Sequence, residues 1–158
     1  MKQLAIFVDV SNLYFCLGKE YGKKLKYKKY LNYIEDFGDV VLKKAYGAQV
    51  NNEANKFIDH LNVLGFDTYF KEPRKVISSE NNVVMKADWD VGITLDIMRN
   101  VDIFDTLILG SADGDFRPLI EYLQSKGKSI IVIACNISQN LKLPNITTIE
   151  IPEGHLES

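Results

Sequence analysis

The chain has 158 residues, a formal net charge of −2, 46% hydrophobic residues and 25% charged residues. This balance is typical of a folded domain with a sizeable core, and it excludes a disordered or low-complexity chain. The small acidic charge gives no bulk signal for nucleic-acid binding, although the lysines and the aspartates are each clustered along the chain.

The sequence also indicates in which cellular compartment the protein is expected. An apolar run begins after only three residues, with no basic leader before it, and no apolar run approaches the length of a membrane span. The two cysteines, Cys16 and Cys135, lie in no ligand spacing, so we expect reduced thiols rather than a disulfide or a zinc site. We therefore expect a cytoplasmic protein that does not enter a membrane.

Short apolar runs alternate with segments of helical spacing, which is the pattern of a largely parallel sheet covered by helices. In chain order the sequence predicts strand 4–8, helices 13–21 and 30–37, strand 40–50, helix 52–64, strand 66–70, a helix from about residue 90 to about residue 100, strand 107–109, a helix after residue 115, and strands 127–134 and 147–151. Residues 76–86 are expected to form a hairpin or a mobile flap. We predict a single domain over residues 1–151 and a disordered tail over residues 152–158.

Aspartates directly follow two of the predicted strands. Asp9 ends the first apolar run, and Asp113 and Asp115 follow the run 107–109 through a small-residue turn. Because the carboxyl ends of parallel strands share one edge of a sheet, where α/β proteins bind ligands, we expect these three carboxylates to converge. They would repel one another unless a cation lay between them.

A third acidic segment precedes the helix that ends near residue 100. Asp88 suits an N-cap and Asp90 the first turn, and either position can explain a carboxylate without a ligand. Asp96 shares an apolar stripe with Trp89 and Ile93, so it needs a partner, whether a metal, a lysine or backbone donors. Asp90 and Asp96 lie about 120° apart on an ideal helix, so we expect one to bind an ion and the other to support it.

The acids of these three segments are hard oxygen donors, which suit Mg²⁺ or Mn²⁺ and argue against zinc. A single acidic turn is usually a solvated loop, but three at equivalent positions favour a metal site. The reaction that best matches such a site is phosphodiester hydrolysis, in which the cation activates water and neutralises charge on the phosphate oxygens. The expected metal ligands and catalytic residues are Asp9, Asp90, Asp113 and Asp115. The expected supporting residues are Asn12, Asp88, Asp96 and Ser111.

Basic residues reach the same edge of the predicted sheet. Lys71, Arg74 and Lys75 follow strand 66–70, and we expect them to contact the substrate together with Lys86 and Arg117.

A second basic segment lies earlier in the chain, where lysines alternate with tyrosines. Its members are Lys19, Lys23, Lys24, Lys26, Lys28 and Lys29, with Tyr21, Tyr27 and Tyr30. It is either a phosphate-binding patch with aromatic stacking or a solvated surface, and the sequence leaves both interpretations open.

Three blocks of the chain, 7–13, 86–96 and 109–119, resemble in the right order the signature blocks of NYN domains, which belong to the PIN-like nuclease superfamily. The LabA-like branch is the most similar. The resemblance implies a three-layer Rossmann-like fold with a central, mostly parallel sheet, and Mg²⁺- or Mn²⁺-dependent endoribonuclease activity on single-stranded or structured RNA. It places metal-binding carboxylates at Asp9, Asp90, Asp113 and Asp115, and Asp96 matches a further acid of the middle block.

The chain departs from the family pattern in two respects. Relatives typically show Ser-Gly-Asp where this chain has Ser111, Ala112 and Asp113, a mild change that does not remove a ligand. Some relatives also carry an extra C-terminal RNA-binding domain that this sequence lacks. Recruitment of RNA is therefore expected to fall to the basic residues named above or to a partner.

Two alternatives remain at this stage. A non-catalytic regulatory or protein-interaction module would keep the fold, and the acidic balance of the chain favours it. A small-molecule phosphatase is disfavoured, because the run after Asp9 lacks the second aspartate of an Asp-x-Asp nucleophile loop. The sequence leaves open whether the protein forms a homodimer and whether one or two ions bind.

Overall fold

The apolar runs form one sheet of six strands in which every neighbouring pair is parallel, in the order β3-β2-β1-β6-β7-β8. The computed structural model describes residues 1–49, 51–77, 80–81, 83–86 and 88–157. The strands of this sheet are β1 (Gln3–Asp9), β2 (Asp39–Ala48), β3 (Asp67–Lys71), β6 (Thr106–Gly110), β7 (Ser129–Ala134) and β8 (Thr147–Glu150). The predicted α/β class is confirmed, although the predicted end of the second strand at residue 50 lies outside the described residues.

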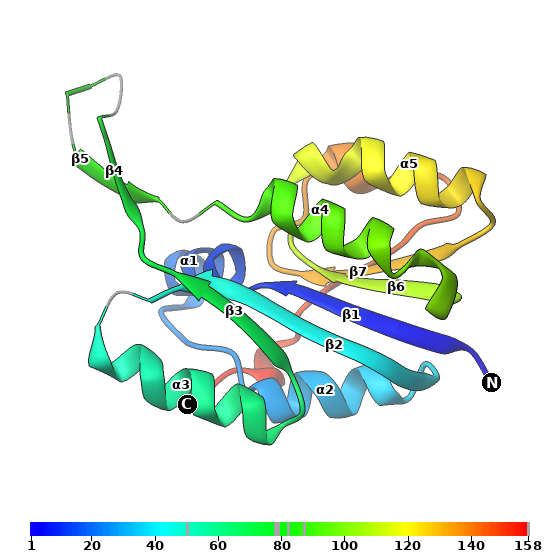
Figure 1. The fold of residues 1–158 in the computed structure, drawn as a ribbon, viewed down its shortest axis with the longest axis horizontal. Helices are drawn as coiled ribbons and strands as arrows, with labels where there is room; N and C mark the ends of the chain where they lie inside the picture. Colours follow the sequence, from blue (N-terminus) through cyan, green and yellow to red (C-terminus); the bar gives the residue numbers. More distant parts are fainter. Residues whose placement is uncertain (50, 78–79, 82, 87, 158) are drawn as a thin grey trace.

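Helices cover both faces of this sheet and make the fold three-layered. They are α1 (Val10–Tyr21), α2 (Tyr27–Glu35), α3 (Asn52–Val63), α4 (Asp90–Arg99) and α5 (Arg117–Ser125). Figure 1 shows α2 and α3 on one face and α4 and α5 on the other. The first helix begins three residues earlier than predicted, because the Asp9 carboxylate accepts a hydrogen bond from the backbone N–H of Asn12 and so caps it.

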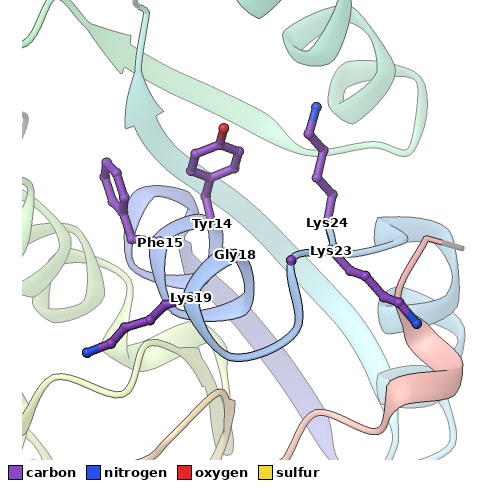
Figure 2. Close-up of a pocket in the computed structure, with 7 residues that line it drawn as sticks. Tyr14, Phe15, Gly18, Lys19, Lys23 and Lys24 are labelled. Carbon is purple, nitrogen blue, oxygen red and sulfur yellow. The ribbon is translucent and has the colours of Figure 1, made fainter.

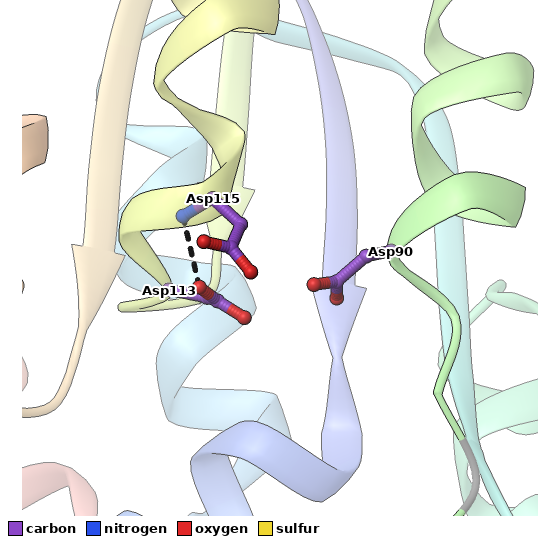
Figure 3. A group of neighbouring side chains, drawn as sticks. All are labelled: Asp90, Asp113 and Asp115. Carbon is purple, nitrogen blue, oxygen red and sulfur yellow. Dashed lines mark hydrogen bonds between the residues drawn. The ribbon is translucent and has the colours of Figure 1, made fainter.

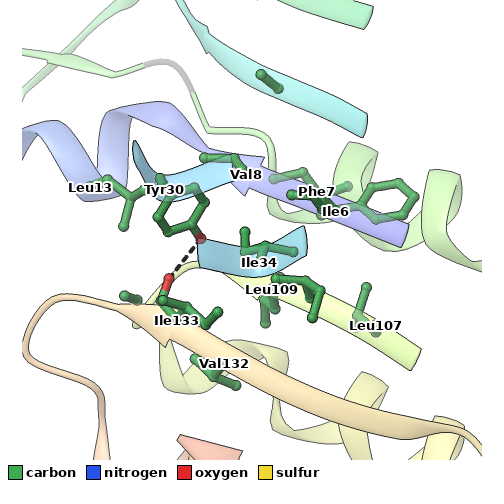
Figure 4. Packing of buried hydrophobic residues seen from close by; sticks show 14 of the residues in the cluster. Ile6, Phe7, Val8, Leu13, Tyr30, Ile34, Leu107, Leu109, Val132 and Ile133 are labelled. Carbon is green, nitrogen blue, oxygen red and sulfur yellow. Dashed lines mark hydrogen bonds between the residues drawn. The ribbon is translucent and has the colours of Figure 1, made fainter. Parts of the chain in front are cut away.

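The core lies on both sides of the central strands, as expected for parallel strands buried on two faces. From Leu4 to Val8 every residue of β1 is inaccessible to solvent. Figure 4 shows this strand in the same sheet as β6 and β7, with Tyr30 and Ile34 of α2 packed against them. The Tyr30 hydroxyl donates a hydrogen bond of 2.8 Å to the carbonyl of Ile133, which satisfies a polar group in an otherwise apolar layer.

The strand order reverses between β1 and β6. From β1 the chain proceeds outward to β2 and β3, and it then returns to the other side of β1. Open α/β sheets bind ligands in the crevice at the carboxyl ends of the strands at such a reversal. Asp9 is the last residue of β1 and Gly110 the last of β6, so the two predicted acidic turns meet at this position.

Between β3 and α4 the chain forms an antiparallel hairpin of β4 (Arg74–Ile77) and β5 (Val83–Lys86), in which Arg74 pairs with Lys86. Of the two predicted forms of this segment, the hairpin is therefore the one found. It extends away from the main sheet beyond the carboxyl end of β3 (Figure 1). Residues 78, 79 and 82 of the predicted loop lie outside the described residues.

The prediction of a disordered tail is wrong for residues 152–157. The backbone N–H of Lys26 donates to the carbonyl of His155 at 2.8 Å, and Leu156 is 4% exposed and bridges to Leu25. The His155 ring also packs on Tyr33, with centroids 5.2 Å apart. A single leucine in a polar segment carries no periodic pattern, so this contact could not be predicted from the sequence. Residue 158 lies outside the described part of the chain.

Among the helices of the described residues, none is both long and apolar enough to cross a lipid bilayer.

Candidate metal centre

The turn after β6 holds two aspartates in a fixed arrangement. The Asp113 carboxylate accepts a hydrogen bond of 2.9 Å from the backbone N–H of Asp115 and caps the short 3-10 helix Gly114–Phe116. The hydroxyl of Ser111, which is fully buried, accepts from the backbone N–H of Asp113 at 3.3 Å. The local backbone therefore directs both carboxylates to the same side of the turn.

Asp90 reaches these two acids from the opposite wall. It is the first residue of α4, and its backbone N–H donates to the Asp88 carboxylate at 2.9 Å. Asp90, Asp113 and Asp115 each offer a carboxylate oxygen, and these oxygens lie within 4.8 Å of one another (Figure 3).

The spacing of these oxygens fits a divalent cation. Oxygens that bind Mg²⁺ or Mn²⁺ at about 2.1 Å lie at most about 4.2 Å apart, so small side-chain rotations would bring all three onto one ion. The donor set is all carboxylate, which suits a hard cation and not a thiol- or imidazole-binding metal.

Asp9 lies beside this group and is 8% exposed. Burial raises its pKa to about 6, and the negative charges of Asp88 and Asp113 act in the same direction, whereas the backbone N–H groups of Asn12 and Ser11 lower it. Asp9 is not one of the three acids whose oxygens cluster, but its carboxyl is close enough to Asp88 and Asp113 for their charges to act on it.

The pKa of Asp90 is raised further, to about 7. Burial is the largest cause, followed by a hydrogen bond between the Asp90 and Asp113 carboxyls and by the charges of Asp113, Asp88 and Asp9. A proton shared between two carboxylates relieves their repulsion in the same way that a cation would. A positive charge, whether a proton or a cation, would therefore stabilise this group of carboxylates.

Two of the predicted supporting residues organise the site through the backbone. The Asn12 side-chain oxygen accepts a hydrogen bond of 3.0 Å from the backbone N–H of Ala112, which joins α1 to the turn after β6. Asp88 was expected to be an N-cap. Its carboxylate does accept from the backbone near the helix start, but the residue that immediately precedes the helix is Trp89.

The partner that Asp96 needs is provided by β2 and by its own helix. Its carboxylate accepts a hydrogen bond of 2.7 Å from the Tyr46 hydroxyl, and it lies 3.8 Å from the Lys44 ammonium and 3.6 Å from the Arg99 guanidinium. Burial and this hydrogen bond raise the pKa of Tyr46 above its usual range. Asp96 therefore connects α4 to the sheet and is not one of the three clustered acids.

Trp89, which the sequence placed only on the apolar stripe, contacts both the sheet and a basic residue. Its indole N–H donates to the carbonyl of Gly47 at 2.9 Å, and the Lys71 ammonium lies 4.3 Å from its ring centroid. Lys71 also donates to the carbonyl of Asp88 at 2.6 Å. The tryptophan and the lysine thus hold the segment that precedes Asp90. The position of Trp89 next to Asp90 in the sequence was the feature from which this role could have been predicted.

The remaining basic candidates are placed differently. Arg74 and Lys75 are exposed on β4, while Arg117 lies 3.3 Å from Glu121 one turn along α5. The Lys86 backbone belongs to β5, and its side chain lies outside what the structure describes.

The fold and the site together define a Rossmann-like α/β protein with a cluster of three acidic side chains at the point where the strand order reverses. A family model described as the NYN domain matches residues 3–147. The chain belongs to the NYN domain family of the PIN-like nuclease superfamily, and the predicted family is confirmed.

The chain is also similar over most of its length to individual proteins. The chain is 29% identical over 150 residues to the low amplitude and bright protein LabA of Synechococcus elongatus, a match that covers 92% of this chain and 80% of LabA. An uncharacterized protein of Methanocaldococcus jannaschii is 28% identical over 152 residues, covering 96% of this chain and 55% of that protein. A crystal structure of a protein of unknown function from Vibrio parahaemolyticus superposes with a TM-score of 0.85 at 29% identity, covering 99% of this chain and 96% of that chain.

Proposed function

We propose that the protein is a metal-dependent endoribonuclease that hydrolyses RNA phosphodiester bonds at the acidic site. The observation that supports this most directly is the group of three carboxylates, Asp90, Asp113 and Asp115, whose oxygens lie within 4.8 Å of one another. Membership of a nuclease superfamily points in the same direction.

In this proposal Asp90, Asp113 and Asp115 hold Mg²⁺ or Mn²⁺, and Asp9 completes the ligand set or binds a water molecule of the ion. The cation, when bound, supplies a more acidic water and neutralises charge on the phosphate. Asn12 and Ser111 hold the turn that carries Asp113, while Asp88 and Trp89 hold Asp90. No side-chain nucleophile is required.

We assign the binding of the phosphate backbone to Arg74 and Lys75 on the hairpin, with Lys86 and Arg117. The first two are exposed and follow β3 at the same edge as the acids. Lys71 donates to the backbone of Asp88, so its main role in this arrangement is to position the segment before α4. We place the protein in the cytoplasm, where two free thiols are stable.

The test is cleavage of a labelled single-stranded RNA by the purified full chain in Mn²⁺ or Mg²⁺. Cleavage should be abolished by EDTA and by Asp113→Asn, and it should be retained by Asp102→Asn, which changes an exposed aspartate of the short helix Val101–Ile103. Activity that persists in Asp113→Asn would show that the cleavage arises elsewhere.

The second candidate, a non-catalytic module, predicts a different result. Because the carboxylate group needs positive charge whatever its role, such a module would bind Mn²⁺ and lose that binding in Asp113→Asn, yet leave every RNA intact. Calorimetric titration with Mn²⁺ beside the cleavage assay separates the two functions.

A further inference from the structure

Helix α1 carries two aromatic side chains that the core does not use. Tyr14 is 55% exposed and Phe15 is 68% exposed, and their rings meet edge to face with centroids 5.6 Å apart. They border a surface depression of about 310 Å³, shown in Figure 2. We call its lining the α1 surface, which consists of Tyr14, Phe15, Gly18, Lys19, Gly22, Lys23 and Lys24.

The lysine side chains of this surface take no part in the ion pairs of the described residues. None of Lys19, Lys23 and Lys24 forms an ion pair within the part of the chain that the structure describes. Lys29 differs, because its ammonium donates to the carbonyl of Gly154. Three lysines therefore line the same depression as the two exposed rings.

The structure also corrects which aromatic side chains accompany these lysines. Tyr27 and Tyr30, which the sequence offered as stacking partners, are 4% and 0% exposed and belong to the core. Tyr21, the third tyrosine of that segment, is 41% exposed, and the same helix also carries the accessible rings of Tyr14 and Phe15. No sequence pattern marked them, because residues 13–21 read only as a helix.

We propose that the α1 surface binds an unpaired segment of RNA, with bases stacked on Tyr14 and Phe15 and phosphates against the lysines. This rests on the proposed function, because the bound segment would belong to the strand that is cleaved at the acids. Exposed aromatic faces beside cations are the combination by which proteins bind single strands without sequence preference. A duplex keeps its base faces stacked and offers only phosphates, so the surface selects single-stranded RNA.

Helix α1 connects this surface to the acids. Asp9 caps the start of the helix and Asn12 bonds to the turn that carries Asp113. At a rise of about 1.5 Å per residue, Phe15 lies roughly 9 Å and Lys19 roughly 15 Å along the helix axis from Asp9. A strand of a few nucleotides spans such a distance.

The experiment is fluorescence anisotropy of the full chain with a labelled, unstructured RNA in EDTA, where hydrolysis does not occur. Phe15→Ala should weaken binding about tenfold, the usual loss of a base-stacking ring. Lys23→Gln with Lys24→Gln should reduce the slope of log affinity against log salt by about 1.4, because each phosphate contact on a single strand contributes about 0.7. A matched control is Tyr122→Ala with Lys126→Gln, an exposed ring and lysine 5.5 Å apart near the end of α5, which should change neither quantity.

Three results would overturn the proposal. Equal RNA affinity of the wild type and Phe15→Ala would show that no base stacks on Phe15. An equal loss of affinity of Phe15→Ala for a duplex of the same sequence would show that the surface does not select single strands. Sedimentation of a wild-type dimer that Phe15→Ala dissociates, with RNA affinity unchanged, would make the α1 surface a contact between copies. Because EDTA removes divalent cations from the binding assay, binding can be detected even where the parallel Mn²⁺ cleavage assay fails, so the two proposals are tested separately.

Discussion

Asn12 and Ala112 are 100 residues apart in the sequence, yet the side-chain oxygen of Asn12 accepts a hydrogen bond of 3.0 Å from the backbone N–H of Ala112. This bond joins the helix capped by Asp9 to the turn that carries Asp113. It fixes the relative position of acids from the two halves of the chain.

Removal of this bond should weaken the cation site without unfolding the protein. We expect Asn12→Ala to lower Mn²⁺ affinity about tenfold or more, the usual effect of losing a group that orients metal ligands. Isothermal titration calorimetry measures the affinity, and circular dichroism checks the fold. The control is Asn62→Ala, which removes an exposed hydrogen bond with Thr68 of the edge strand β3. An unchanged affinity in Asn12→Ala would show that the turn holds its shape unaided.

The raised pKa values of Asp9 and Asp90 predict how stability depends on pH. Both lie above the ordinary aspartate value of 3.8, at about 6 and about 7, so the folded protein binds protons more tightly than the unfolded chain. Their contribution to stability is therefore complete below about pH 4 and is lost as the pH rises through these two values. In EDTA, this contribution should lower the melting temperature between pH 4 and pH 7, and Asp90→Asn should reduce the decline.

Added Mn²⁺ should reverse that dependence. The cation competes with the protons, so its stabilising effect should be small near pH 5 and large above pH 7. Thermal melts with and without Mn²⁺ at several pH values measure this, and Ca²⁺-free buffers avoid a competing ion. A shift of equal size at every pH would contradict proton displacement from these carboxyls.

Substitution of Trp89 should lower both the stability of the fold and the affinity of the site for Mn²⁺. In Trp89→Phe the carbonyl of Gly47 loses its indole donor, which should cost about 1 kcal/mol in the free energy of unfolding. The same change should weaken Mn²⁺ binding, because the segment before α4 loses its anchor. Urea unfolding and calorimetry measure the two effects, with Tyr122→Phe as the exposed aromatic control.

The two thiols are close but should react slowly. The Cys16 thiol lies 2.7 Å from the sulfur of Cys135, and burial raises the pKa of Cys135 to about 12. Little thiolate is present at neutral pH, so in Cys16→Ser the remaining Cys135 should react with an aromatic disulfide reagent only after denaturation. Absorbance of the released thiol follows the reaction, and rapid reaction in the folded state would show that the site opens.

The sequence was sufficient to predict what depends on local pattern and on the shared edge of a parallel sheet. It located the strands that precede Asp9 and Asp113 and predicted that acids far apart in the chain meet there. It could not identify the partner of Asp96, because Tyr46 and Lys44 come from a strand some fifty residues earlier. For the same reason it assigned exposure to Tyr27 and Tyr30, whose burial depends on elements that pack against α2 only in the folded chain.

Because β1 pairs with β6, the acidic site can form only after both strands have been synthesised. During synthesis Asp9 leaves the ribosome early, but the strand that brings Asp113 beside it is about a hundred residues behind. A nascent chain therefore carries an incomplete ligand set until β6 has emerged and paired.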